Sequence, residues 1–477
     1  MLIIVWITLS GCTYTFPEVD SPTAGSADFT KIISVGNSIT SGYANGALYD
    51  EGQEFSFVNI LAGQVNLVTP ITYNQPNINS PVGYSGTLPD GTPMGRLILV
   101  NPDNPFPSPI IPGDAFNETY IGDKSAINNF GVPGLRLIDV DITGYALENP
   151  YFKRFAMDVN SSSVLGDAVA ANSTFFTFWL GNNDVLGFAT AGASGNPDGD
   201  GSSSDDLISS TLFNQKYEPI VSELIANGAK GVIANIPNVT DIPFFTTVPI
   251  DLIYFDNSDP ADTLLMYQLN QDYQSYNQGL KEAQNNNDID QDEADSREIV
   301  FKAGNNGVLI FDESLTDLTS QGLASIRMAT TDDLLTIYAA LVVGQDLGDG
   351  LLGTEIPLPD QYTLTPDEQA MVLARTTEFN DIIQATVNNH AESLALVDIN
   401  AIFKEFAESG VDINGSGLTA SIFPPFSGFS LDGVHPNPRG AAYITNQFIE
   451  AINNKFGAII PLTNPNNYPG NELPVLP

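Results

Sequence analysis

The stretch Lys31-Ile32-Ile33-Ser34-Val35-Gly36, followed by Asn37-Ser38-Ile39-Thr40, decides the fold of this chain. The first half is a short β-branched run that ends in glycine, and the second half leads into a helix, so together they predict a strand that turns directly into a helix. Three more apolar runs have this character, with helix-like stretches between them: residues 174–180, 231–236 and 394–399. This alternation predicts an α/β fold with a parallel sheet covered on both faces.

Two helices are indicated by the residues at their starts. Thr365-Pro366-Asp367-Glu368 combines a capping box with proline at the first helical position, and Asn437-Pro438 begins the last helix in a similar way. The first of these helices closes at His390, where an imidazole commonly faces solvent or the terminal carbonyls. We therefore interpret His390 as a structural residue.

Two long segments do not follow the alternation of strands and helices. Residues 66–124 are rich in proline, glycine and asparagine, and residues 240–360 mix loops and helices with one further apolar run at 307–311. Both follow strand-end positions, so we expect two large insertions near the active face of one domain over residues 29–460. Residues 461–477 are the expected C-terminal tail.

The composition excludes one class of function and favours a globular protein. The chain has 477 residues, with 16 Lys+Arg against 57 Asp+Glu and a net charge of −41, which would repel a nucleic acid. Hydrophobic residues make up 42% and aromatic residues 10%, enough for a sizeable core. The acidity suits a salty or extracellular setting, and a compositional bias of the lineage explains it equally well.

The N-terminus predicts a lipid anchor. The apolar run at residues 2–7 is followed by Leu9-Ser10-Gly11-Cys12, which matches the bacterial lipobox, although no Lys or Arg precedes the run. We expect a lipoprotein signal peptide over 1–12, lipidation at Cys12, and a tether over 13–28, which would place the protein at the cell envelope, on the outer membrane or the extracellular surface. The alternative is a buried apolar N-terminal segment. A single cysteine also excludes a disulfide framework and a cysteine-based zinc site.

Only His390 and His435 could act as a histidine base, and two histidines exclude a polyhistidine metal centre. Asp432 precedes His435 by three residues in a turn before the last helix. This spacing lets the carboxylate accept a hydrogen bond from one ring nitrogen and leaves the other nitrogen free as a general base. The candidate nucleophile is Ser38, at the carboxyl end of the first strand and at a helix N-terminus. Its alternative role is a simple helix cap.

Two further turns could supply hydrogen-bond donors. Gly134 ends the stretch at residues 128–134, and its missing Cβ would let the backbone N–H approach a ligand. Asn183 follows the buried strand at 174–180, and its side-chain amide could act as a second donor. Each feature alone is an ordinary turn. The motif Gly-x-Ser-x-Gly of the α/β-hydrolase nucleophile elbow is not present at Ser38, because Thr40 occupies its last position.

In chain order, Gly36-Asn37-Ser38, Gly134, Gly181-x-Asn183-Asp184 and Asp432-x-x-His435 resemble the four sequence blocks of the SGNH, or GDSL-type, hydrolases. The resemblance spans residues from about 28 to 460 and is strongest to the long lipoprotein members typical of Bacteroidetes. It implies a three-layer α/β/α flavodoxin-like fold with a mostly parallel sheet.

The same resemblance implies roles for individual residues. Ser38 would be the nucleophile, His435 the base and Asp432 the acid that orients it. The oxyanion donors would be the Ser38 and Gly134 backbone N–H groups and the Asn183 side chain. No metal or organic cofactor is implied. The chain departs from the family at Asn37, where the usual residue is aspartate, and this puts the local network and the pH optimum in doubt.

We therefore expect a monomeric serine ester hydrolase that acts on a small-molecule or polymer-borne ester. A thioesterase or lysophospholipase could use the same residues. The alternative from another class is a surface protein that binds a glycan or lipid on the same scaffold without turnover. Two acidic stretches, Asp288–Asp292 and Asp198–Asp200, alternate carboxylates as calcium loops do. The first lacks the required glycine and bidentate glutamate and the second fails similarly, so we interpret both as solvated loops.

Overall fold

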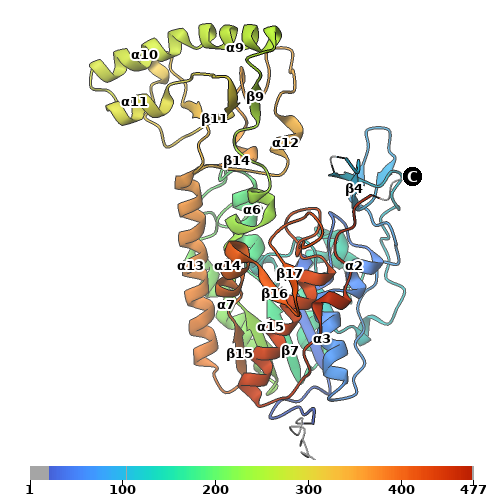
Figure 1. Cartoon of the computed structure of the whole chain (residues 1–477). Coiled ribbons are helices and arrows are strands. Elements are labelled where there is room, and N and C mark those ends of the chain that lie inside the picture. Colours follow the sequence, from blue (N-terminus) through green and yellow to red (C-terminus); the bar gives the residue numbers. More distant parts are fainter. Residues whose placement is uncertain (1–20, 104, 475–477) are drawn as a thin grey trace, which may run out of the picture.

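A computed structural model describes residues 21–103 and 105–474 (Figure 1). Its centre is a five-stranded sheet in the order β15-β8-β7-β1-β6, with every neighbouring pair parallel. The prediction of an α/β fold with a parallel sheet is confirmed. The strands are β1 (Ile32–Gly36), β6 (Asn129–Gly131), β7 (Phe175–Trp179), β8 (Lys230–Ala234) and β15 (Leu394–Val397). The sequence did not predict β6, which is short and carries only one apolar side chain.

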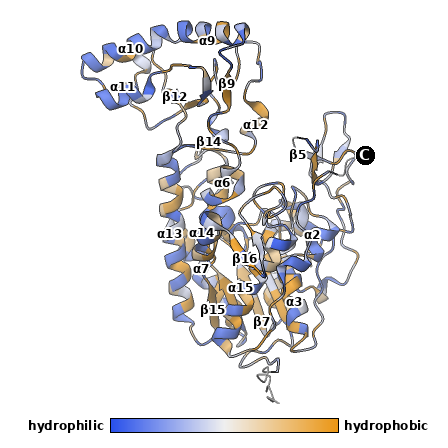
Figure 2. Cartoon of the chain, in the orientation of Figure 1, coloured by the Kyte–Doolittle hydropathy of each residue, from blue (hydrophilic) through white to orange (hydrophobic). Residues whose placement is uncertain are grey.

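The two faces of the sheet bury different side chains because successive residues of a strand point to opposite sides. Phe176 and Phe178 of β7 lie in one apolar cluster, with residues of α5 (Val164–Ala170), α7 (Ser210–Ile225) and α13 (Pro366–Asn389). Phe175 and Trp179 lie in the opposite cluster, with residues of α3 (Phe57–Asn66) and α15 (Pro438–Phe456). Figure 2 shows the apolar residues concentrated in the central strands and on the helix faces that cover them. The helices therefore form two layers around the sheet.

The helix starts predicted from the sequence are confirmed. Thr365 and Glu368 form both hydrogen bonds of a capping box at the start of α13. Asn437 accepts a hydrogen bond from the Gly440 N–H, with proline at the first position of α15. The shorter helices of the body are α1 (Ser38–Ser41), α2 (Asp50–Glu54), α4 (Pro150–Lys153), α6 (Asn182–Thr190), α8 (Pro243–Thr246) and α14 (Ile399–Ser409), and β16 (Val411–Ile413) pairs with β17 (Ser416–Leu418).

Residues 248–364, here called the lobe, project from the body beyond the upper end of α13 (Figure 1). The lobe has apolar clusters of its own. Its apolar run at 307–311 supplies β11, which pairs with β12 and not with the central sheet. Its helices are α9 (Pro260–Asp272), α10 (Gln274–Asn285), α11 (Gln291–Arg297) and α12 (Ala339–Val342). Its paired strands are β9 (Ile253–Phe255) with β10 (Gly304–Asn306), β11 (Leu309–Phe311) with β12 (Ile326–Met328), and β13 (Leu334–Leu335) with β14 (Thr363–Leu364).

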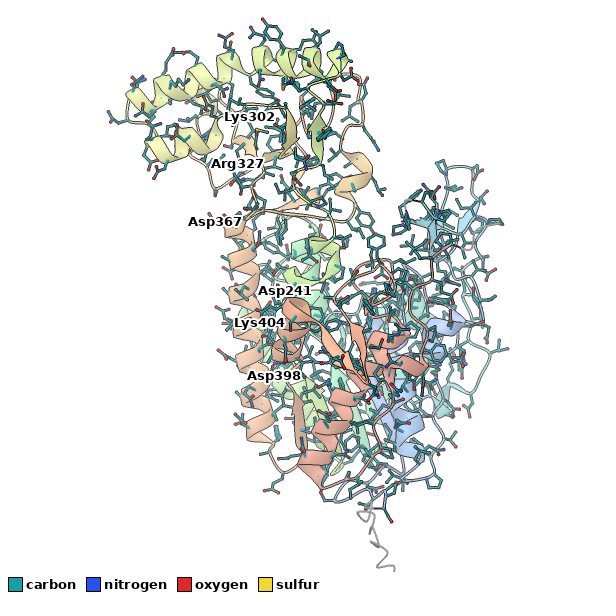
Figure 3. The ribbon with its side chains drawn as sticks, viewed as in Figure 1. Asp241, Lys302, Arg327, Asp367, Asp398 and Lys404 are labelled. Atoms are coloured by element: carbon teal, nitrogen blue, oxygen red, sulfur yellow. The ribbon has the colours of Figure 1, made fainter. Side chains whose placement is uncertain are left out.

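A buried ion cluster holds the lobe together. Arg327 lies inside the lobe (Figure 3) and pairs through Nε with Asp312 at 2.6 Å and through Nη2 with Asp333 at 2.7 Å. All three side chains are less than a tenth exposed. One guanidinium offsets the charge of the two carboxylates only in part, and its loss would leave both carboxylates buried without a counter-charge.

Residues 66–124 form an extended segment with two short antiparallel ribbons, β2 (Gly86–Thr87) with β3 (Pro93–Met94) and β4 (Leu97–Val100) with β5 (Phe106–Pro109). The buried guanidinium of Arg154 fixes this segment by donating to the carbonyls of Pro76 at 3.0 Å, Asn77 at 2.6 Å and Asn117 at 2.8 Å. Burial lowers the pKa of Arg154 to about 10.

The ends of the described chain are held against the body. Thr23 pairs with Ile459, and the Ser26 N–H donates to the Phe456 carbonyl, so contacts with the body begin before residue 28, where the expected tether would end. In the C-terminal tail, Asn471 donates to the carbonyls of Ile422 and Phe429. The expected signal peptide and Cys12 lie outside the described residues. No described helix is both long and apolar enough to span a bilayer.

Candidate active site

Ser38 lies where the order of the sheet strands reverses. The chain passes from β1 to β6 on one side and then crosses to β7 on the other, and ligands of open α/β sheets bind in the crevice at such a point. Ser38 is the first residue of α1, and the Asn37 side chain caps this helix by accepting from the Ile39 N–H at 3.1 Å. A Cβ on Gly36 would collide with Thr40, so the tight turn before the serine requires glycine.

Ser38, His435 and Asp432 form a continuous hydrogen-bonded chain. His435 Nε2 lies 2.8 Å from Ser38 Oγ, and His435 Nδ1 lies 3.0 Å from Asp432 Oδ2. When Nδ1 carries the proton it donates to the carboxylate, and Nε2 then accepts from the serine hydroxyl. The structure thus joins the serine and the histidine across 397 positions of sequence.

Asp432 is held as a buried carboxylate. Its Oδ1 accepts from the N–H groups of Val434 and His435, both at 2.9 Å, and its Oδ2 accepts from the Gly46 N–H at 2.9 Å. Burial alone would raise the pKa of Asp432, but His435 and these backbone donors lower it to about 2. The group is therefore ionised at every pH at which the protein is expected to work, and it can stabilise a positive charge on the imidazole.

A loop that the sequence analysis did not single out supports this chain of residues. Asn45 Oδ1 accepts from the Leu431 N–H at 2.9 Å, and the Asn45 N–H donates to Ser430 Oγ at 3.0 Å. Asn45 has a φ of 53°, which asparagine tolerates better than most residues. The dipeptide Asn45-Gly46 is a turn signal in the sequence, but its contact with residues 386 positions away could not be inferred from it.

Gly134 and Asn183 lie in the turns that follow β6 and β7 and line the same cavity as Ser38. Gly134 is exposed and has a φ of 80°, a conformation that favours glycine. Asn183 Nδ2 donates to the Leu135 carbonyl at 3.0 Å, which fixes the amide and leaves its second hydrogen for another acceptor. Both residues line one cavity with Ser38 and His435. The structure therefore brings all of the predicted site residues in the body together.

Asp184 ties these two turns together. Its carboxylate accepts from the Leu137 N–H at 2.7 Å and from the Ile138 N–H at 3.5 Å, so it links the start of α6 to the loop that follows Gly134. Burial raises the pKa of Asp184 to about 6, partly offset by the Leu137 N–H and Arg136. The sequence blocks contain Asp184, but only the structure shows which backbone groups it holds.

The cavity beside Ser38 has a volume of about 560 Å³ and a mostly polar or aromatic wall. Burial, together with Tyr151 and Asp432, raises the pKa of Tyr43, so this tyrosine is neutral. The Tyr43 ring lies 5.0 Å from the His435 ring and 6.2 Å from the Tyr151 ring. The other lining residues are Pro133, Arg136, Asp139, Tyr145, Glu148, Leu186, Gly187, Thr190 and Ser204.

Other polar residues from the sequence analysis lie elsewhere. His390 Nε2 lies 2.8 Å from Glu218 Oε1 on α7, so it links two helices of the covering layer. Asp290 caps α11 by accepting from the Glu293 N–H, and Asp198 pairs with Arg375. Within residues 21–103 and 105–474, no group of three or more His, Cys, Asp or Glu side chains could hold a metal ion.

No protein-family model matches the sequence, and no curated protein matches it. An α/β hydrolase, LAE5 from the metagenome of Lake Arreo in Spain, aligns in structure with 10% identity and a TM-score of 0.33, over 89% of this chain and 96% of that one. The extracellular lipase from Streptomyces rimosus aligns with 11% identity and a TM-score of 0.31, over 90% of this chain and 100% of the lipase. At such low scores neither likeness bears on the function of this chain.

Proposed function

We propose that this protein is a serine ester hydrolase of the SGNH type. The observation that carries the proposal is the chain of hydrogen bonds from Ser38 Oγ through the His435 ring to Asp432, which opens onto a cavity. Two features support the SGNH assignment. The central strands, numbered along the chain, have the order 2-1-3-4-5 of flavodoxin-like sheets, and each of the four sequence blocks supplies a residue to the lining of one cavity: Ser38, Gly134, Asn183 and His435.

The proposed reaction is acyl transfer to water. Ser38 Oγ attacks the ester carbonyl carbon while its proton moves to His435 Nε2, and the ester bond then breaks as His435 returns the proton to the leaving alcohol. A water molecule attacks the acyl-serine in the same way, giving the carboxylic acid and free Ser38. Asp432 holds the imidazole and stabilises its charge throughout.

The oxyanion of each tetrahedral intermediate would lie among three donors. We assign these to the backbone N–H groups of Ser38 and Gly134 and to the second hydrogen of Asn183 Nδ2. Donors held in place before the reaction need no reorganisation when charge develops, and the loss of one lowers turnover by about a hundred- to a thousandfold in comparable sites. The Asn183 bond to the Leu135 carbonyl supplies this rigidity.

The substitution of Asn37 for the usual aspartate is compatible with this function. The Asn37 side chain still caps the helix that begins at Ser38, through an oxygen that an aspartate would also supply. The residue loses a charge without losing this hydrogen bond. We therefore expect asparagine at position 37 to change the pH dependence of the reaction and to leave Ser38 as the nucleophile.

The test is Ser38→Ala. Removal of the nucleophile should lower p-nitrophenyl acetate hydrolysis by up to about a millionfold, to the level that the remaining site supports. Ser38 should also react covalently with a fluorophosphonate probe in the parent protein and not in the variant. Circular dichroism of the variant should match the parent. Full activity of Ser38→Ala would disprove the mechanism, and absence of labelling in the parent would favour a binding protein without turnover.

We further propose that Cys12 is lipidated and anchors the enzyme, as a monomer, at the cell envelope or extracellular surface. The support is the lipobox in the sequence. Cys12→Ala should move the expressed protein from the membrane fraction to the soluble fraction. Unchanged partitioning would contradict the anchor and would leave the proposed chemistry intact.

A further inference from the structure

We infer that the cavity beside Ser38 takes a short acyl ester of an uncharged, polyhydroxylated alcohol, of which an acetylated neutral sugar is the simplest case. This inference rests on the proposed function and adds a substrate class to it. Three properties of the cavity wall carry the argument: its charge, its hydrogen-bonding groups, and the scarcity of aliphatic side chains among the residues that line it.

The charge of the wall disfavours anionic substrates. Arg136 is the only Lys or Arg among the described residues that line the cavity. Its Nε and Nη2 donate to the two oxygens of Asp139 at 2.8 and 3.0 Å, and its Nη1 donates to the Ser203 carbonyl at 2.7 Å. The guanidinium is therefore neutralised and held. Glu148 adds a further carboxylate at the wall, so a phosphate or uronate group would meet net negative charge there.

The unused hydrogen-bond donors and acceptors of the cavity wall suit a ligand that carries hydroxyl groups. The carboxylate of Glu148 can only accept, so its ligand must supply O–H or N–H donors. The Tyr145 hydroxyl accepts from Asn149 Nδ2 at 3.3 Å and keeps its own hydrogen to donate. Thr190 Oγ1 donates to the Leu186 carbonyl at 2.9 Å and keeps its lone pairs. A sugar unit, whose hydroxyls both donate and accept, can satisfy all three residues.

The shape and chemistry of the wall limit the acyl group. Pro133 and Leu186 are the only aliphatic side chains of more than one carbon on the lining. Apart from these two side chains, the tyrosine rings and two glycines, the lining groups are charged, amide, imidazole or hydroxyl groups, against which burial of the methylenes of a long acyl chain gains little. The apolar cavity near Trp179 and Tyr443 shares no lining residue with this one and is much smaller, with a volume of about 60 Å³ against about 560 Å³. An acetyl group fits these limits.

The aromatic residues of the wall suit the apolar side of a sugar ring. Tyr43 and Tyr151 both line the cavity and lie nearly perpendicular to each other, at 84°. Such a pair offers a broad, weakly polar surface against which the C–H groups of a pyranose can pack, while its hydroxyls face Glu148 and Tyr145. The position of Tyr43 against His435 puts this surface beside the reacting serine.

The experiment compares matched esters on the purified full chain at low ionic strength. One series varies the acyl group, with p-nitrophenyl acetate, butyrate, octanoate and dodecanoate. The other varies the charge of the carrier, with acetylated xylan against acetylated polygalacturonate, scored by acetate release. We expect kcat/KM to fall by about a hundredfold from acetate to dodecanoate and to be about tenfold lower on the acidic polymer. Added salt should reduce the difference in kcat/KM between acetylated xylan and the acidic polymer, because salt screens the charges.

A charge-reversal variant makes the test specific. Glu148→Lys should raise kcat/KM on the acidic polymer several-fold relative to xylan. Glu223→Lys makes the same charge change at an exposed position near the end of α7 that does not line the cavity, so it should leave this ratio unchanged. Equal rates on the two polymers at low salt, or a preference for dodecanoate, would overturn the inference even if Ser38 is labelled. A parent protein that hydrolyses no ester and takes up no fluorophosphonate would overturn the proposed function itself.

Discussion

The site-bearing edge of the sheet and the lobe are both built on buried polar contacts, but of opposite kinds. At the sheet edge, Asp432 is surrounded by one imidazole and three backbone N–H groups that come from short loops. In the lobe, Arg327 is buried between two carboxylates that come from its own segment. The charge at the sheet edge is stabilised by the main chain and by an imidazole that lines the cavity, whereas the two carboxylates in the lobe are held by one buried guanidinium.

The two regions meet at α8 and at the start of α13. At α13, Gln369 Nε2 donates to the Asp332 carbonyl of the lobe at 2.8 Å, and Leu334, Ile337 and Leu364 of the lobe pack with the larger apolar cluster of the body. The Phe244 N–H donates to the Gly433 carbonyl in the loop between Asp432 and His435, and the Phe244 carbonyl accepts from the Ile337 N–H of the lobe. The Phe244 ring also lies 5.4 Å from the ring of Tyr338. Among the described residues, the hydrogen bonds of Ser38 Oγ and of the His435 and Asp432 side chains involve no residue of the lobe, so we expect that the lobe can lose stability without disrupting them.

The largest expected effect is on the lobe alone. Arg327→Leu would leave Asp312 and Asp333 buried without a counter-charge, and the loss of one partner of a buried ion pair typically lowers the free energy of unfolding by about 3–5 kcal/mol. We expect limited proteolysis of the variant to cut first within residues 248–364, while hydrolysis of p-nitrophenyl acetate continues.

The matched control for this prediction is the triple variant in which Arg327, Asp312 and Asp333 are all replaced by leucine. With no charge left to bury, it should recover most of the lost resistance to protease. Loss of esterase activity in parallel with cleavage of the lobe in Arg327→Leu would show that the two regions are one cooperative unit, contrary to the comparison.

The sequence predicted the sheet edge better than the lobe, and the reason is physical. Parallel strands place their carboxyl ends at one edge of the sheet. The turns that follow β1 and β7 therefore lie at the same edge, however far apart they are in the sequence. Ser38 and Asn183 could therefore be placed from local patterns. The ion cluster around Arg327 follows no periodicity, because any acidic residue of the segment could have been its partner. The strand β6 was missed because Asn129-Phe130-Gly131 is too short and polar to be recognised.

The second prediction concerns pH and belongs to the body. The pKa of Asp184 is raised to about 6 by burial, above its value in the unfolded chain. The folded state therefore binds a proton more tightly than the unfolded state, so its stability falls as the pH rises from about 4 to about 6. The expected loss from this group is at most about 3 kcal/mol.

Urea unfolding at pH 4 and pH 6.5 would measure this loss. Glu368, at the start of α13, has a pKa raised to about 7, chiefly by burial, and contributes in the same direction. Comparison of the parent with Asp184→Asn separates the contribution of Asp184 from that of Glu368. The asparagine keeps an acceptor for the Leu137 N–H but cannot ionise. If the free energy of unfolding of Asp184→Asn changes between pH 4 and pH 6.5 by as much as that of the parent, the pH dependence does not come from Asp184.

The smallest expected effect tests the loop that supports the histidine. Asn45→Gly keeps the positive φ accessible but removes the oxygen that accepts from the Leu431 N–H, which precedes Asp432 directly. Asn45 does not line the Ser38 cavity, so it is a positioning residue, and we expect kcat to fall by about tenfold with KM nearly unchanged. Asn45→Asp keeps the accepting oxygen and should restore most of kcat at neutral pH. A variant that instead raises KM and leaves kcat intact would mean that the loop shapes the cavity and does not orient the Asp432 and His435 pair.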